Sequence, residues 1–379
     1  MMDLPEQGRF VGRVWRPGIG PAVVELRGGR LVDVTCAQVP TLRDLLEMDD
    51  PVAWLDSARG DEIGALADFA VTGAGGDDAR LLAPCDLQAI KASGVTFAAS
   101  MVERVIEEQA AGDPDLAAGI RARIGESIGA NLRGIVPGSD RAAEVARILK
   151  AEGLWSQYLE VGIGPDAEIF TKSQPMAAVG WGADVGLHPV SRWNNPEPEV
   201  VLAVDSRGRI KGATLGNDVN LRDVEGRSAL LLGKAKDNNA SAAIGPFLRL
   251  FDAGYGLDDV RRAELTLRVE GADGYVLDGR SSMDQISRDP ADLVAQAIGR
   301  HHQYPDGFML YLGTLFAPTQ DRDAPGQGFT HHPGDVVTIS EPSLGALVNT
   351  VRLSTECPPW EFGAGALMRN LAGRGLLGA

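Results

Sequence analysis

The sequence has few of the features that mark secreted, membrane-spanning or nucleic-acid-binding proteins. Its 379 residues include three widely spaced cysteines, so no disulfide framework or zinc motif is legible. The opening MMDLPEQGRF has no apolar signal region, and no apolar run approaches membrane-spanning length. The formal net charge of −16 argues against a basic, nucleic-acid-binding face. We therefore expect a cytoplasmic protein that binds neither a membrane nor a nucleic acid.

Two other common kinds of site are also missing from the sequence. There is no G-x-x-x-x-G-K-[ST] phosphate loop, and the G-x-G pairs at 162–164 and 180–182 lead into no dinucleotide-binding pattern. The histidine pairs at 301–302 and 331–332 consist of adjacent residues, which point to opposite faces of a strand. We interpret both pairs as loop histidines, and we expect no nucleotide cofactor.

Two domains and an α+β fold are predicted from the order of the patterns. Alternating apolar residues near the start favour short strands, so residues 1–85 are expected to form a small β-rich N-terminal domain. The larger domain would span 86–379, with a helix at Ala98–Ala110 and a charged, amphipathic helical insertion at about 112–152. The apolar run Phe247–Phe251 is interpreted as a short helix.

The stretch from Arg192 to Pro246 carries the main candidate site. Glu197 and Glu199 stand two apart at the start of an apolar, β-branched run, so their carboxylates project from one face of a strand. Asp218 follows in a Gly-Asn-Asp sequence on the next expected strand. Three such oxygens suit a hard divalent cation, Mg²⁺ or Mn²⁺, that keeps positions open for water and substrate. A nearby lysine, Lys234 or Lys236, would add an acid, a base or a charge clamp.

Each of these features alone has a more ordinary interpretation. An isolated Glu-x-Glu pair is more often a solvated strand edge, and Asn-Asp is more often a turn. Glu103 by itself would be an ordinary helix carboxylate, and a lone strand lysine is usually exposed. The ordered combination, rather than any single residue, makes the metal site the favoured interpretation.

That combination resembles the fumarylacetoacetate hydrolase superfamily. Its catalytic domain carries E-x-E, then G-x-x-x-x-ND-x-S-x-RD, then a lysine separated by eight residues from a Gly-Pro turn, which here selects Lys236 over Lys234. Asn220 stands in place of the family serine. The resemblance covers roughly residues 88–355. It implies a mixed β-roll or β-sandwich catalytic domain with the metal ligands Glu197, Glu199 and Asp218.

Other segments resemble the family's substrate-binding elements. Residues 94–103 are similar to a G-x-N-Y-x-x-H-x-x-E element that supplies a His–Glu pair, but here Ser100 replaces the histidine while Glu103 is kept. Lys172 lies in a run similar to the family's LFLK element, and Thr314 ends a strand similar to the one whose Gly-Thr meets a substrate carboxylate. The resemblance implies catalytic roles for Glu103, Lys236 and Ser100, and substrate contacts for Lys172, Thr314 and Ser100.

The missing histidine and the helical insertion favour dehydration over hydrolysis. They are similar to the sugar-acid branch, which implies conversion of 2-keto-3-deoxy-D-xylonate (equally named as the D-arabinonate) to 2,5-dioxopentanoate, or α-ketoglutarate semialdehyde, in oxidative pentose degradation. The base would be Lys236 or Glu103, and the sequence does not choose between them. We expect burial beside a cation to lower the pKa of Lys236.

Three further expectations accompany this hypothesis. An acylpyruvate or diketone C–C hydrolase, or a 2-keto acid decarboxylase, is the alternative enzyme, and it would require Glu103 to activate water without a histidine. A catalytically silent ligand-binding relative is the second alternative, although such a relative has little reason to keep three ligands that are costly to bury unpaired. The family resemblance also implies a homodimer or homotetramer.

Overall fold

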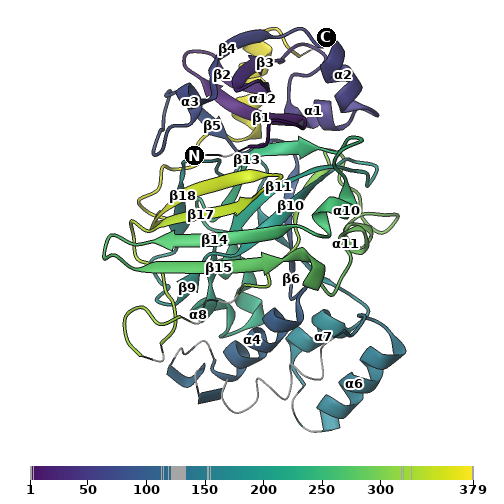
Figure 1. Ribbon diagram of the computed structural model, residues 1–379, viewed down its shortest axis with the longest axis vertical. Coiled ribbons are helices and arrows are strands. Elements are labelled where there is room, and N and C mark those ends of the chain that lie inside the picture. The colour runs from purple at the N-terminus through teal and green to yellow at the C-terminus, as the bar shows by residue number, and fades with distance from the viewer. Residues whose placement is uncertain are drawn as a thin grey trace.

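Two β-sheets pack against each other at the centre of the molecule, with the N-terminal elements at one end and a group of helices at the other (Figure 1). A computed structural model describes residues 2, 4–111, 113, 115–117, 119–120, 134–151, 153, 155–316, 318, 320–325 and 327–377. At positions 98–100 and 107 it describes the backbone only. Within these residues, no helix is both long enough and apolar enough to cross a membrane.

The first sheet runs from the N-terminal strands to the strands of the predicted metal site. In spatial order it contains β4 (Asp61–Ala65), β3 (Arg30–Asp33), β2 (Gly20–Arg27), β1 (Phe10–Arg16), β13 (Ala242–Leu250), β11 (Ile210–Asp218), β10 (Pro198–Val204), β16 (Phe308–Tyr311), β6 (Ala89–Gly94) and β7 (Glu168–Ser173), with β5 (Arg80–Leu82) beside β1. Strands β16 and β6 are parallel, and the other neighbours are antiparallel, so the sheet is mixed.

The second sheet covers one face of the first. Its order is β15 (Val276–Ser282), β14 (Glu264–Glu270), β17 (Val336–Glu341), β18 (Gly345–Leu353) and β8 (Asp184–Leu187). Alternate residues of β14 are buried and exposed, as expected for a strand with one solvated face. Every residue of β10 is buried, because this strand is covered on both faces. The mixed sheets and accompanying helices confirm the predicted α+β class.

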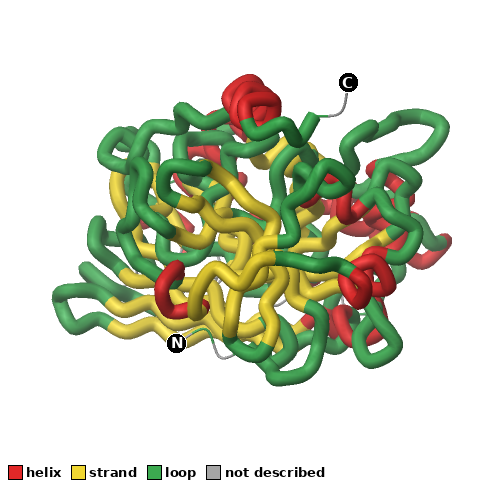
Figure 2. The backbone as a smooth tube through the Cα atoms, turned by 90° about the horizontal axis from the view of Figure 1, so that it is seen from above, coloured by secondary structure: helices red, strands yellow, loops and turns green. Residues whose placement is uncertain are grey.

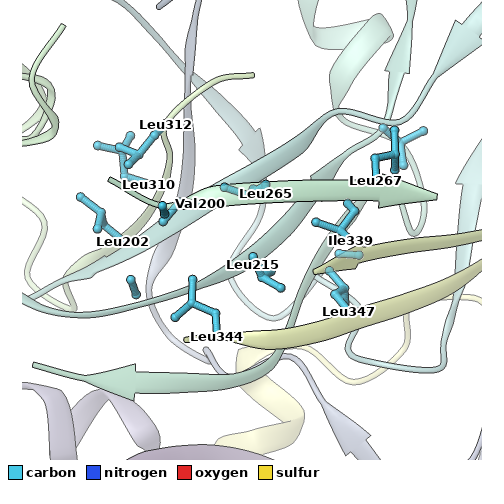
Figure 3. Packing of buried hydrophobic residues seen from close by; sticks show 14 of the residues in the cluster. Val200, Leu202, Leu215, Leu265, Leu267, Leu310, Leu312, Ile339, Leu344 and Leu347 are labelled. Carbon is cyan, nitrogen blue, oxygen red and sulfur yellow. The ribbon is translucent and has the colours of Figure 1, made fainter. Parts of the chain in front are cut away.

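The main hydrophobic core fills the space between the two sheets. Leu202 of β10, Leu215 of β11 and Leu310 of β16 pack in one cluster with Leu267 of β14 and Ile339 of β17 (Figure 3). All of these side chains are at most a few per cent exposed. Burial on this scale holds strands β10 and β11 in fixed register, and therefore fixes the positions of the carboxylates that they carry.

The helices lie around the strands rather than between them (Figure 2). Near the N-terminal strands are α1 (Leu42–Leu46), α2 (Pro51–Ser57), α3 (Leu66–Phe69) and α12 (Ala364–Gly373). At the opposite end are α4 (Ala98–Gln109), α6 (Asp140–Ala151) and α7 (Gln157–Ile163), with their own apolar cluster. Shorter elements are β9 (Asn194–Asn195), β12 (Asn220–Leu221), α8 (Arg222–Glu225), η1 (Ala229–Leu231), α9 (Leu232–Lys236), α10 (Leu257–Val260), η2 (Met283–Gln285) and α11 (Pro290–Ala297).

Three sequence-based expectations can be compared with these elements. Helix α4 confirms the helix predicted at Ala98–Ala110. The short helix predicted at Phe247–Phe251 is wrong, because these residues belong largely to β13, whose nine residues are all buried between neighbouring strands. The predicted helical insertion at 112–152 lies partly outside the described residues; α6 occupies its last part.

Candidate metal centre and active site

The three predicted metal ligands meet at one end of the first sheet. Glu197 immediately precedes β10, Glu199 is its second residue, and Asp218 ends the antiparallel neighbour β11. Glu199 pairs with Gly216 across the two strands, which brings the start of β10 beside the end of β11. One oxygen from each carboxylate lies within 4.8 Å of the others, and all three residues are buried. The predicted convergence of these ligands is therefore present.

The chemistry of this cluster fits a divalent cation. Burial first, and repulsion from Asp218 second, raise the pKa of Glu199 well above its ordinary value. Burial likewise raises the pKa of Glu197, against the attraction of Lys236. Buried carboxylates that repel one another are stabilised by a metal ion, and three hard oxygen donors with open positions suit Mg²⁺ or Mn²⁺. The residues that would hold the ion are Glu197, Glu199 and Asp218.

The loop after β16 orients one of these ligands. The backbone N–H of Gly313 donates a hydrogen bond to a Glu199 carboxylate oxygen at 2.6 Å. Gly313 has a φ of +87°, and a Cβ at this position would lie 2.1 Å from Oγ1 of Thr96. Only glycine fits both the left-handed backbone and this close approach. The glycine therefore allows a backbone amide to reach the metal-binding carboxylate.

Lys236, at the end of α9, is the lysine at the site. Its Nζ lies 2.6 Å from Glu197 and 3.1 Å from Asp218, and its side chain is buried, whereas Lys234 is exposed. The expected lowering of its pKa beside a bound cation stays a prediction. Burial lowers the pKa of Lys236, but the attraction of Asp218, Glu197 and Glu225 outweighs burial and raises the pKa. These three carboxylates therefore favour the protonated form of Lys236.

Lys172 lies behind Asp218 rather than in the pocket where a substrate contact would place it. Its Nζ is 2.9 Å from Asp218 Oδ1 and donates hydrogen bonds to the carbonyls of Val219 and Lys236. The side chain is fully buried. Burial lowers its pKa despite the attraction of Asp218. The predicted substrate contact of Lys172 stays a prediction, and the contacts place its ammonium group against Asp218, enclosed by protein atoms.

The other predicted residues surround a pocket beside the carboxylates. This pocket opens to solvent, and its wall includes Glu103, Thr314 and the three predicted metal ligands. Glu103 of α4 lies 3.5 Å from Arg222. The Thr314 hydroxyl accepts a hydrogen bond from the Phe316 N–H at 3.1 Å and can still donate one to a ligand. Ser100 belongs to α4, but its side chain lies outside the described residues.

Two functional candidates were missed by sequence reasoning. Glu168, the first residue of β7, lines the pocket, and burial followed by repulsion from Glu225 raises its pKa to about 7. Arg104 of α4 lies 2.6 Å from Glu197 and 2.9 Å from Glu225. The only sequence signal for Glu168 was its place at the start of the run that contains Lys172. Arg104 gave no signal, because its partners are about a hundred residues away.

The site can now be compared with known proteins. The sequence profile of the fumarylacetoacetate hydrolase C-terminal family matches residues 142–352, which is more than half of the chain. The chain belongs to the fumarylacetoacetate hydrolase family. The matched region includes all three predicted metal ligands, Lys172, Lys236 and Glu168, and it excludes α4 with Glu103 and Arg104.

Two curated relatives match about half of the chain. The 2-dehydro-3-deoxy-D-arabinonate dehydratase of Saccharolobus solfataricus is 29% identical over 185 residues, which are 49% of this chain and 58% of the relative. A probable 2-keto-3-deoxyxylonate dehydratase of Haloferax volcanii is 29% identical over 194 residues, 51% of this chain and 63% of the relative. The matches thus span less than two thirds of either relative.

A solved structure shares the fold over nearly the whole chain. It is a 2-keto-3-deoxy-D-arabinonate dehydratase in complex with magnesium and 2,5-dioxopentanoate, with a TM-score of 0.63 and 20% identity. The match covers 91% of this chain and 99% of the solved chain. At this identity the similarity shows the fumarylacetoacetate hydrolase type of fold, including elements outside residues 142–352.

Proposed function

We propose that this protein is a Mg²⁺-dependent hydro-lyase that removes water from 2-keto-3-deoxy-D-xylonate (equally named as the D-arabinonate) and forms 2,5-dioxopentanoate. The observation that carries the proposal is the convergence of a buried carboxylate triad, a protonated lysine and a carboxyl group of raised pKa on one pocket. The names of the two relatives and of the solved structure support the same substrate class. The product would serve oxidative pentose degradation.

The acidic end of the pocket matches the 2-keto acid end of this substrate. Glu197, Glu199 and Asp218 would hold the cation, which supplies Lewis-acid polarisation of the keto oxygen and makes the protons at carbon 3 more acidic. The Thr314 hydroxyl, at the pocket wall beside Gly313, is available to donate a hydrogen bond to the carboxylate. The substrate would therefore bind with its carboxylate and keto group toward the sheet.

Two proton transfers then remain for the side chains. A base takes a proton from carbon 3, and an acid protonates the hydroxyl group that leaves carbon 4 as water. Glu168 is the better base, because a carboxyl with a pKa of about 7 exchanges its proton near neutral pH. Lys236 is the better acid, because its ammonium group is buried at the site and donates hydrogen bonds to Glu197 and Asp218. Glu103, held beside Arg222, remains a candidate for orienting the substrate.

The dehydrated compound must then rearrange to give the aldehyde. Loss of water leaves a double bond between carbons 3 and 4. Carbon 5 then loses a proton and carbon 3 regains one, which moves the double bond to carbons 4 and 5 and gives an enol. The enol hydroxyl loses its proton and carbon 4 gains one, which leaves the terminal aldehyde. Carbon 3 both loses and regains a proton, so one carboxyl group facing it can serve in each direction, first as base and then as acid.

The test is a coupled assay with 2-keto-3-deoxy-D-xylonate and Mg²⁺, in which an NAD(P)-linked semialdehyde dehydrogenase reports the aldehyde. We expect aldehyde formation that stops with a chelator and in Glu197→Gln. Glu168→Gln should lower kcat by about 10²- to 10⁴-fold. Lys234→Met, which changes an exposed lysine two residues from Lys236, is the control and should keep full activity. Pyruvate release from an acylpyruvate, with no aldehyde from the sugar acid, would make the protein a hydrolase instead.

A further inference from the structure

Asn195 places an unused hydrogen-bond acceptor at the wall of the active-site pocket. It is the second residue of β9, which pairs with β12 so that Asn195 faces Asn220. The side-chain Nδ2 of Asn195 donates to the carbonyl of Pro196 at 2.9 Å, which fixes the amide orientation. Its Oδ1 is buried and has no hydrogen-bond partner among the residues that the structure describes.

Ser93 provides a second such group in the same pocket. It lies in β6, which pairs with β16 and β7, and is 2% exposed. No described residue makes a hydrogen bond with its hydroxyl. The pocket wall therefore carries two buried polar atoms without partners, and they come from segments about a hundred residues apart in the chain.

Such atoms are costly unless a ligand satisfies them. A buried polar atom without a partner destabilises the folded protein, and folded proteins satisfy roughly nine in ten or more of these groups. The adjacent Asn194 shows the ordinary situation, because its Oδ1 accepts from the His331 N–H and its Nδ2 donates to Ser191. Asn195 differs from its neighbour in that its oxygen is left for something in the pocket.

The chemistry of Asn195 Oδ1 restricts what that ligand group is. An amide oxygen only accepts hydrogen bonds, so its partner must carry an N–H or O–H. The carboxylate and keto oxygens of a 2-keto acid are also acceptors and cannot serve. In the proposed substrate, the hydroxyl on carbon 4 departs in the reaction, so the hydroxyl on carbon 5 is the one that remains for a lasting contact.

We infer that Asn195 accepts a hydrogen bond from the terminal hydroxyl of the substrate, with Ser93 as a second contact, and thereby selects hydroxylated 2-keto acids over their deoxy analogues. The inference rests on the proposed function and adds a specificity-determining residue to it. A site built to bind a hydroxyl rejects a ligand that lacks it, because the buried acceptor is then left unpaired.

The experiment compares two substrates that differ only at carbon 5. These are 2-keto-3-deoxy-D-xylonate and 4-hydroxy-2-oxopentanoate, which has a methyl group in place of the terminal carbinol. Loss of each substrate is followed directly, at one Mg²⁺ concentration. We expect the wild-type protein to favour the hydroxylated substrate by about 10²-fold or more in kcat/KM. Asn195→Ala should reduce this preference at least tenfold, through the hydroxylated substrate alone.

Asn194→Ala is the matched control, because it removes the same side chain from the neighbouring position whose amide is already paired. It should keep the wild-type preference even if it lowers stability. If Asn195→Ala does not fold, the same substrate comparison is made with Asn195→Ser, which retains a small polar group, and with Ser93→Ala. Each should show a partial loss of preference.

The outcomes separate this inference from the proposed function. If the wild-type protein dehydrates neither compound, the proposed function fails and the inference falls with it. If it dehydrates the sugar acid but Asn195→Ala and Ser93→Ala keep the full preference, only the inference is overturned. An equal loss on both substrates in Asn195→Ala would mean a structural role for Asn195 and would also overturn it.

Discussion

Replacing Lys236 with methionine should destabilise the metal-free protein far more than the metal-bound protein. Methionine keeps a long, flexible side chain and removes the charge. Lys236 is buried and contacts two carboxylates, Glu197 at 2.6 Å and Asp218 at 3.1 Å. In the absence of a metal ion, the substitution leaves these buried acids with less compensating charge.

The size of the effect follows from the partners that remain. Removing one member of a buried ion pair costs about 3–5 kcal/mol. Here each carboxylate keeps another cation, since Arg104 lies 2.6 Å from Glu197 and Lys172 lies 2.9 Å from Asp218. We therefore expect the lower end, about 3 kcal/mol. Mg²⁺ should recover much of this loss, because a cation at the triad supplies the missing positive charge and binds the folded state alone.

Urea unfolding followed by tryptophan fluorescence, in EDTA and in saturating Mg²⁺, measures both quantities. Lys236→Met should lose about 3 kcal/mol in EDTA and show a larger Mg²⁺-dependent gain than wild type. Lys234→Met is the matched control and should stay within about 0.5 kcal/mol of wild type in both conditions, as expected for an exposed side chain. The same loss of stability with and without Mg²⁺ would refute the reasoning, because Lys236 and the metal would then not share the carboxylates.

Three further predictions concern other residues of the site. Burial raises the pKa of Glu168 to about 7 from an ordinary 4.5, so between these pH values the folded protein holds a proton that the unfolded chain releases. As the pH rises from 4.5 to 7 in EDTA, the free energy of unfolding should therefore fall by about 3 kcal/mol more in wild type than in Glu168→Gln. Urea unfolding at a series of pH values would measure this difference. Gly313→Ala should lower Mg²⁺ affinity measured by calorimetry, because its Cβ would meet Thr96 and displace the amide that orients Glu199; unchanged affinity would contradict this. Lys172→Met should cost about 3–5 kcal/mol in chemical denaturation, since it leaves a buried carboxylate with one partner fewer, and a loss below 1 kcal/mol would argue against the ion pair.

The convergence of the three carboxylates could be predicted from the sequence because these residues keep a fixed order along two neighbouring strands. Glu197 and Glu199 share a strand face through the period of two, and Asp218 lies on the next antiparallel strand, so local geometry nearly determines their meeting. The choice of Lys236 over Lys234 required the family spacing, because the two lysines are chemically the same and stand two residues apart. The structure separates the two lysines by burial, which the sequence pattern does not encode.

Other parts depended on contacts between distant segments. Asn195 became a candidate only because its side-chain oxygen has no partner among the described residues, whereas the side-chain oxygen of its neighbour Asn194 accepts from the His331 N–H. The raised pKa of Glu168 comes from burial and from Glu225, neither of which is visible in its own stretch of sequence. The apolar run at 247–251 was interpreted as a helix because a strand covered on both faces shows no alternation, and short apolar runs are ambiguous for that reason.

The pairing of β1 with β13 has a consequence for any attempt to excise residues 1–85. Phe10 and Val11 pair with Arg249 and Leu248, so the first strand covers the backbone edge of a strand whose nine residues are all buried. Excision would turn that edge into an open, apolar template for other chains. The shortened protein would self-associate before its chemistry could be assayed, and loss of activity would then report aggregation rather than a missing catalytic group.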